Sequence, residues 1–195
     1  MNYPLQLSFK VLAIAQQLSL RDAAGNLIFY VKQKAFKLKE AVTVFADAEQ
    51  TQPVFYINAN KILDFSANYQ FTDRAGAPVG SVRRQGMRSI WRASYDIYDE
   101  RNNHVMSIKE EKPWAKVFDS LLGEVPVLGI FTGFLFHPSY LVFRPDGMPF
   151  MRLTKQRAFF EGKFILEKLA ELHPVDETRT LLGVLMMLLL ERTRG

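Results

Sequence analysis

Residues 176–192 read DETRTLLGVLMMLLLER, and the part from 181 to 190 contains no charged or hydrogen-bonding side chain. Leucine and methionine are strong helix formers, and the acidic start and basic end of the stretch suit the helix dipole. A helix that is apolar on every face lies either inside protein or inside lipid. Because a membrane-spanning helix needs about 20 apolar residues, the shorter run here predicts a helix buried inside the protein.

A buried helix needs surrounding structure, and the rest of the chain is rich in hairpin signals. Several segments share one order: a turn rich in Asp, Gly and Asn, then a strand-like run, then a basic residue. The turns span residues 21–26, 72–76, 98–103 and 144–147. Asp and Asn side chains close such turns, and Gly and Asn tolerate positive φ. With the strand-like runs that precede the turns, each segment predicts a β-hairpin.

Two less regular hairpins complete the pattern. One joins strands at residues 41–45 and 54–57, and the other pairs residues 150–155 with 159–166. Near the N-terminus, Ala13-Ile14-Ala15 resembles a signal-peptide cleavage site, but polar residues interrupt the apolar stretch before it. We therefore expect an amphipathic first strand rather than a signal peptide.

About ten to twelve short antiparallel strands and one apolar helix predict a mainly β fold. Closure of a sheet into a barrel removes its exposed edges, and a barrel that holds a helix needs more than the usual eight or so strands. We expect a closed antiparallel β-barrel of about twelve strands that encloses the C-terminal helix. It forms a single domain over residues 1–195.

An uncharged segment at residues 125–143 is the main alternative to this reading. Its length reaches that of a membrane span, but it contains Pro126, Gly129, Gly133 and Pro138. It therefore predicts a buried loop followed by a strand. Just before it, Pro113 suits the first turn of a short helix at residues 115–122.

Two motifs resemble a known family. Residues 30–40 (YVKQKAFKLKE) and residues 114–129 (WAKVFDSLLGEVPVLG) are similar to the LURP-one-related proteins. The resemblance extends over nearly the whole chain and implies the tubby C-terminal-like fold, a roughly twelve-stranded barrel threaded by a helix. Phospholipid scramblases and the phosphoinositide-binding tubby domain share that architecture. The chain has neither the palmitoylated cysteine cluster nor the acidic calcium loop of scramblases, and the resemblance transfers no catalytic residue.

Basic clusters are the main functional signal. The net charge is +5 and the pI is near 9.4, which makes lipid head groups or nucleic acid plausible partners. The first cluster contains Lys32, Lys34, Lys37 and Lys39, and the second contains Arg83, Arg84, Arg88 and Arg92. Beside aromatic residues, such side chains can hold phosphates, and each contributes about 1 kcal/mol near an anionic membrane. The alternative is that both clusters are solvated strand faces and barrel rims.

The sequence gives little support for a disulfide, a metal site, an enzyme or a nucleic-acid-binding protein. With no cysteine in the chain, disulfides and thiolate metal sites are excluded. His104, His137 and His173 lack metal-binding spacing, so no metal and no cofactor are expected. No nucleotide-binding or hydrolase motif is present, and no nucleic-acid-binding motif is recognised.

We therefore expect a non-catalytic, soluble β-barrel module, cytoplasmic or peripheral to a membrane, that binds anionic phospholipid head groups. The alternative is a protein-interaction or regulatory scaffold with no lipid ligand. An enzyme or small-ligand carrier would need a polar cavity, for which a filled barrel leaves little room.

Overall fold

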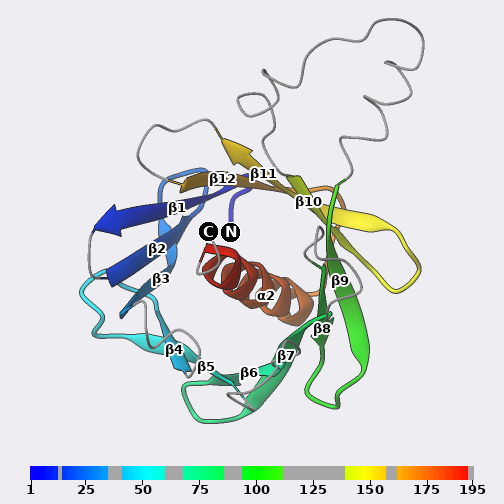
Figure 1. Cartoon of the computed structure of the whole chain (residues 1–195), viewed down its shortest axis with the longest axis horizontal. Coiled ribbons are helices and arrows are strands. Elements are labelled where there is room, and N and C mark those ends of the chain that lie inside the picture. The colour runs from blue at the N-terminus through cyan, green and yellow to red at the C-terminus, as the bar shows by residue number, and fades with distance from the viewer. Residues whose placement is uncertain are drawn as a thin grey trace, which may run out of the picture.

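Antiparallel strands surround a central helix in the computed structural model, which describes residues 1–12, 15–34, 41–59, 68–85, 94–111, 139–156 and 162–192 (Figure 1). The elements are β1 (Leu5–Leu12), β2 (Ala15–Arg21), β3 (Leu27–Lys34), β4 (Ala41–Phe45), β5 (Pro53–Ala59), β6 (Asn68–Asp73), β7 (Pro78–Arg84), β8 (Ser94–Tyr98), β9 (His104–Glu110), β10 (Ser139–Phe143), β11 (Pro149–Gln156), β12 (Gly162–Lys168) and α2 (Pro174–Arg192). The predicted closed barrel of about twelve strands around the C-terminal helix is confirmed.

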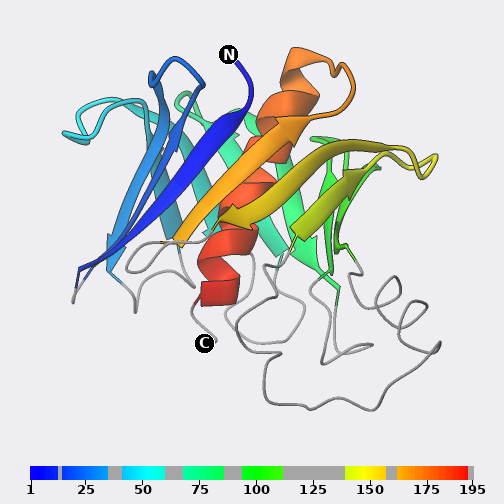
Figure 2. The ribbon, with the colours of Figure 1, turned by 90° about the horizontal axis from the view of Figure 1, so that it is seen from above.

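Each strand pairs with its neighbours along the chain, and β12 pairs with β1 to close the ring. The closing register runs from Leu5↔Leu166 to Phe9↔Gly162. The seam between β3 and β4 is narrow, since the described residues contribute the single pair Tyr30↔Phe45 to it. Because strand direction alternates, the turns after β2, β4, β6, β8 and β10 all lie at one end of the barrel, where α2 also enters (Figure 2). We call this the turn end.

Aspartate side chains organise the hairpin turns as the sequence predicts. Asp73 Oδ1 accepts hydrogen bonds from the backbone N–H groups of Ala75 (2.8 Å) and Ala77 (2.9 Å). Gly76 completes this turn with a φ of 84°, in the left-handed region where glycine is favoured. The carboxylates of Asp22, Asp47 and Asp99 each accept two or more backbone N–H groups in the same way.

The core lies between the inward faces of the strands and α2. Along β1, Leu5, Leu7 and Phe9 are buried, while the residues between them face outward, as a strand's two-residue period requires. The helix begins at Pro174 rather than at Asp176 as predicted, because proline fits the first helical position. The apolar run of the helix is buried from Leu181 to Leu189. Within this run Leu188 has the most exposed side chain, at 5%. The helix is therefore buried inside the protein, as predicted.

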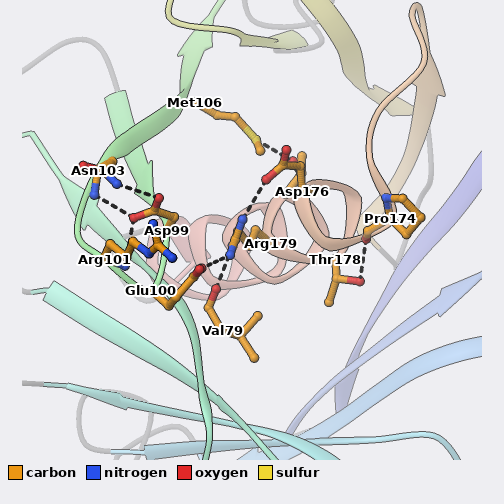
Figure 3. A network of polar contacts seen from close by, with 11 residues as sticks. Val79, Asp99, Glu100, Arg101, Asn103, Met106, Pro174, Asp176, Thr178 and Arg179 are labelled. Carbon is orange, nitrogen blue, oxygen red and sulfur yellow. Dashed lines mark hydrogen bonds and ion pairs between the residues drawn. The ribbon is translucent and has the colours of Figure 1, made fainter.

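Polar contacts fix α2 at the turn end (Figure 3). The guanidinium of Arg179 donates from Nε to the Val79 carbonyl at 2.7 Å and from NH1 to Asp176 at 2.8 Å. Its NH2 group also pairs with Glu100 in the turn between β8 and β9. Since Arg179 is itself buried, these contacts satisfy its donors and tie the helix to two separate hairpins.

A second polar contact holds the other end of α2. The Tyr95 hydroxyl of β8 donates to Glu191 Oε1 at 2.5 Å. The register of the helix along the barrel axis is thus set at both ends.

Some predicted segments fall only partly within the described residues. Residues 139–143 of the uncharged segment form β10, as predicted for its strand portion. Residues 125–138, the expected helix at 115–122 and the motif at 114–129 lie outside the described residues. Among the helices that the structure does describe, none is long and apolar enough to cross a bilayer.

Candidate functional site

The first predicted cluster is represented by Lys32 and Lys34. Lys32 is exposed, and its neighbour Val31 is buried, so Lys32 lies on the outer face of β3. The backbone of Lys34 pairs with Ala15 near the end of the same strand. Lys37 and Lys39 lie outside the described residues.

The second predicted cluster does not form one surface. Arg83 and Arg84 are consecutive on β7 and so point to opposite faces of the barrel wall. Arg83 stacks on the outside, its guanidinium carbon 4.8 Å from the centroid of the Tyr98 ring. Arg84 is half-buried and faces the helix, with NH2 3.8 Å from Glu191. Arg88 and Arg92 lie outside the described residues.

The structure instead groups Lys32 with cations that the sequence analysis did not select. These are Lys10 of β1, Arg21 of β2 and Lys163 of β12, which are all exposed. Lys10 is directly opposite Gln17, and Gln17 is directly opposite Lys32. Because neighbouring strands lie about 4.8 Å apart, the backbones of Lys10 and Lys32 are about 10 Å apart. We call Lys10, Arg21, Lys32 and Lys163 the basic face.

A hollow of about 350 Å³ opens in the basic face. Its lining consists of Ser8, Lys10, Gln17, Ser19, Arg21, Tyr30, Ala48 and Lys163. Lys163, Ser8, Ser19 and Tyr30 lie directly opposite one another across β12, β1, β2 and β3. Since the two serines are short and the surrounding basic side chains are long, the middle of this row is recessed. The floor of the hollow carries hydroxyl groups and its sides carry cations.

The cations of the basic face are available to a ligand. Within the described part of the chain, Lys10, Lys32 and Lys163 form no ion pair. Among the described residues, the Arg21 guanidinium has one partner, the Gly25 carbonyl, to which NH1 donates at 2.9 Å. One acid is near: burial raises the pKa of Tyr30, and the charge of Glu49 raises it further. The basic face therefore keeps an excess of positive charge, with Glu49 at its edge.

The signal for this site in the sequence is weak because its members are scattered. Lys10, Arg21 and Lys163 are isolated basic residues, each at an outward position of a different strand. Lys163 reaches Ser8 only because β12 closes the barrel against β1. Alternation of buried and exposed residues could have identified each cation as outward-facing, but the closing register could not be read from local sequence.

A second polar hollow, of about 320 Å³, lies on the outer face of β8 and β9. Here Ser107 Oγ donates to Asp96 Oδ1 at 2.8 Å, and His104 Nε2 lies 3.0 Å from the same hydroxyl. In a nucleophilic triad the histidine stands between the serine and the acid. Because Ser107 bonds the carboxylate directly, this trio does not have the triad arrangement. Among the described residues, no three His, Asp or Glu side chains gather as a metal site.

Comparisons with known proteins relate the chain to a protein family and to a solved structure. A family model described as LURP-one-related matches residues 27–159. An X-ray structure of a protein from Arabidopsis thaliana is similar over 94% of this chain and 90% of that chain, with 14% identity and a TM-score of 0.47. None of the curated proteins matches the chain. The family match includes Lys32 but not Lys10, Arg21 or Lys163, so it carries no information about most of the basic face.

Proposed function

The chain belongs to the LURP-one-related family, and we propose that it is a non-catalytic β-barrel module that binds anionic phospholipid head groups at the surface of a membrane. In this proposal the protein is cytoplasmic and associates with the bilayer peripherally. The basic face, which includes Lys32 of the first predicted cluster, supplies the contact.

The grouping of exposed cations on the basic face, where Lys10, Lys32 and Lys163 form no ion pair with any described residue, is the observation that supports this proposal most directly. Arg84 and Arg179, which lie where the helix contacts the barrel wall, each pair with a carboxylate. Lys10, Lys32 and Lys163 extend from β1, β3 and β12, which belong to one run of four neighbouring strands, with no acid paired to them in the described structure. Each such cation contributes about 1 kcal/mol near an anionic surface, so several together give useful attraction without a specific pocket.

Vesicle binding tests the proposal. Wild-type protein should co-sediment with phosphatidylserine–phosphatidylcholine vesicles and not with pure phosphatidylcholine vesicles. Lys32→Gln/Lys163→Gln should bind the anionic vesicles about thirty-fold more weakly, because two contributions of about 1 kcal/mol are lost. Added salt should weaken wild-type binding, since exposed charges are screened within about 8–10 Å.

A matched control separates the basic face from net charge. Arg74→Gln/Arg101→Gln removes two exposed cations from turns at the turn end, away from the basic face. This variant should bind like wild type. Equal binding of the wild type to neutral and anionic vesicles would rule out the electrostatic proposal, and equal losses in the two double variants would assign binding to net charge alone.

A protein-interaction scaffold is the second candidate, and one observation favours it. Met148, Leu169 and Val175 are large apolar side chains that are 60%, 46% and 43% exposed. They lie in or near the turn end, where Leu169 N donates to the Phe150 carbonyl at 2.7 Å. If vesicle binding fails, these residues are the first place to seek a protein contact.

A further inference from the structure

We infer that the hollow in the basic face is a binding site for one phosphomonoester group, carried either by a lipid head group or by a free phosphorylated polyol. The inference rests on the proposed function in its lipid form, since it names the head-group chemistry that the basic face selects. It differs from that proposal in requiring a defined pocket rather than a charged surface.

The arrangement of donors fits a compact anion. Ser8 and Ser19 are directly opposite each other in the middle of the hollow. Lys163 lies beside Ser8 on one flank, and Tyr30 lies beside Ser19 on the other. Lys10 is two residues from Ser8 along β1, and Arg21 is two residues from Ser19 along β2, toward opposite ends of the strands. A group seated over the serines therefore meets cations from three directions.

The chemistry favours a phosphomonoester over a diester or a carboxylate. A phosphomonoester carries about −1.5 to −2 charges and presents three acceptor oxygens, which can face three separate cations at once. A diester has two free oxygens and a single charge, and both of its ester arms need a way out of the hollow. Hydrogen bonds from charged donors to such oxygens are about twice as strong as neutral ones.

The size of the hollow limits the ligand to a head group. Ligand pockets have volumes of about 300–1,000 Å³, and at about 350 Å³ this one lies at the lower limit. Its floor and sides are mostly hydroxyl, amide and basic groups. Among the described residues that line it, the only apolar side groups are Ala48 and the ring of Tyr30. They are too small a surface to hold an acyl chain, so a lipid would place its phosphorylated head in the hollow.

Substitution of Glu49 should change phosphate affinity in the opposite direction to substitution of the lysines. The carboxylate of Glu49 raises the pKa of Tyr30 after burial does, which places its negative charge within electrostatic reach of the floor. A bound phosphate is repelled by that charge. Glu49→Gln should therefore strengthen phosphate binding several-fold, whereas a nonspecific effect of reduced stability would weaken it.

Calorimetric titration tests the inference, with inositol trisphosphate as the monoester probe and glycerophosphoinositol as the diester probe. The wild type should bind the trisphosphate at least about tenfold more tightly than the diester. Lys10→Gln/Lys163→Gln should bind the trisphosphate at least about thirty-fold more weakly, because two hydrogen bonds from charged donors are lost. Arg74→Gln/Arg101→Gln should bind the trisphosphate like wild type. Because Lys32 lies outside the lining, Lys32→Gln should weaken trisphosphate binding less than Lys10→Gln or Lys163→Gln alone. Thermal melts check that each exposed substitution leaves the fold intact.

The outcomes separate this inference from the proposed function. Absence of trisphosphate binding, or equal losses of affinity in the hollow and control variants, overturns the inference that the hollow binds a phosphomonoester. If the wild type still binds phosphatidylserine vesicles in that case, the membrane proposal stands. Trisphosphate binding without binding to vesicles containing phosphatidylinositol bisphosphate assigns the hollow to a free phosphorylated polyol and defeats the membrane proposal. Competition between the trisphosphate and those vesicles assigns it to the lipid head group.

Discussion

Single aspartates determine the geometry of the hairpin turns. Asp47 accepts hydrogen bonds from Thr51 Oγ1 at 2.7 Å and from the backbone N–H of Gln52 at 2.8 Å. Asp99 accepts from the side chain of Asn103 at 2.9 Å and from its backbone N–H at 2.7 Å. All of these bonds favour the charged carboxylate, so the pKa of each group lies below its ordinary value, with the side-chain donor as the largest cause.

We expect these two turns to make the protein sensitive to acid. A carboxylate with a lowered folded-state pKa adds stability that is fully present above its unfolded value of 3.8 and is lost as the pH falls through the folded value. Asp47→Asn/Asp99→Asn keeps an acceptor oxygen but cannot titrate. Urea unfolding should show the wild type to be the more stable at pH 7, with the difference shrinking below about pH 4. A difference that stays constant with pH would mean that these carboxylates add nothing through their charge.

Residue types alone could not assign every basic side chain. Lys32 could be placed outside the barrel from the alternation of strand β3, and the structure agrees. Arg84 sits in an equally plausible cluster, yet it faces inward toward Glu191 of the helix. Its partner is more than a hundred residues away, and their meeting depends on where α2 sits along the barrel axis. A local pattern cannot supply that information.

At the level of elements, α2 and the barrel wall approach each other closely at Gly183. A Cβ atom at this position would lie 2.6 Å from Cδ1 and 3.0 Å from Cγ1 of Ile97 in β8. Ile97 is fully buried, so its side chain has little room to move away. Glycine inside a helix costs about 1 kcal/mol relative to alanine, and here that cost is offset by the close packing it permits.

We therefore predict that Gly183→Ala destabilises the protein despite the higher helix propensity of alanine. Overpacking a core typically costs about 1–3 kcal/mol, which exceeds the propensity gain of about 1 kcal/mol. Ile97→Val removes the atom that the new Cβ meets, so the double variant should recover part of the loss. A double-mutant cycle by chemical denaturation should give a favourable coupling of about 1 kcal/mol. Additive effects would show that the helix and β8 are not in tight contact at this position.

The existence of the elements could be predicted well, but their ends could not. Hairpin turns have strong local chemistry, and the strands they predict at residues 41–45 and 104–108 correspond to β4 and β9. A strand was expected at residues 159–166, of which 159–161 lie outside the described residues; β12 spans Gly162–Lys168 and so ends two residues later than predicted. Its C-terminal end extends because the backbone of Lys168 pairs with Met151 of β11, and that ladder depends on a partner rather than on local propensity.

For the whole molecule, the apolar C-terminal helix made the overall architecture predictable from the sequence. An all-apolar helix demands a wall on every side, and the hairpin signals supply enough strands, so the closed barrel could be predicted. The basic face could not, because closure itself creates it by setting the C-terminal strand against the N-terminal one. Overall architecture followed from hydrophobic pattern, while the candidate site depended on the register of the last pair of strands.

The same enclosure makes the centre of α2 the least tolerant part of the molecule. Leu185 is 1% exposed and lies in the middle of α2, and the strands of the barrel surround that helix (Figure 1). A carboxylate there must lose its hydration or take up a proton, at a cost of several kcal/mol, against the roughly 5–15 kcal/mol of stability of a typical domain. We predict that Leu185→Asp does not fold, and that Leu185→Ala folds with a loss of about 2–5 kcal/mol. Val175→Asp is the matched control.

Val175 lies in the first turn of the same helix and is 43% exposed, and an acidic residue there suits the helix dipole. Its substitution should change stability by no more than about 0.5 kcal/mol. Circular dichroism and thermal melts of the three variants distinguish the two positions, because the aspartate at 185 is buried in the middle of the helix and the one at 175 is exposed in its first turn. If Leu185→Asp melted cooperatively near the wild-type temperature, the centre of α2 would have access to water, and the barrel could not be closed around it.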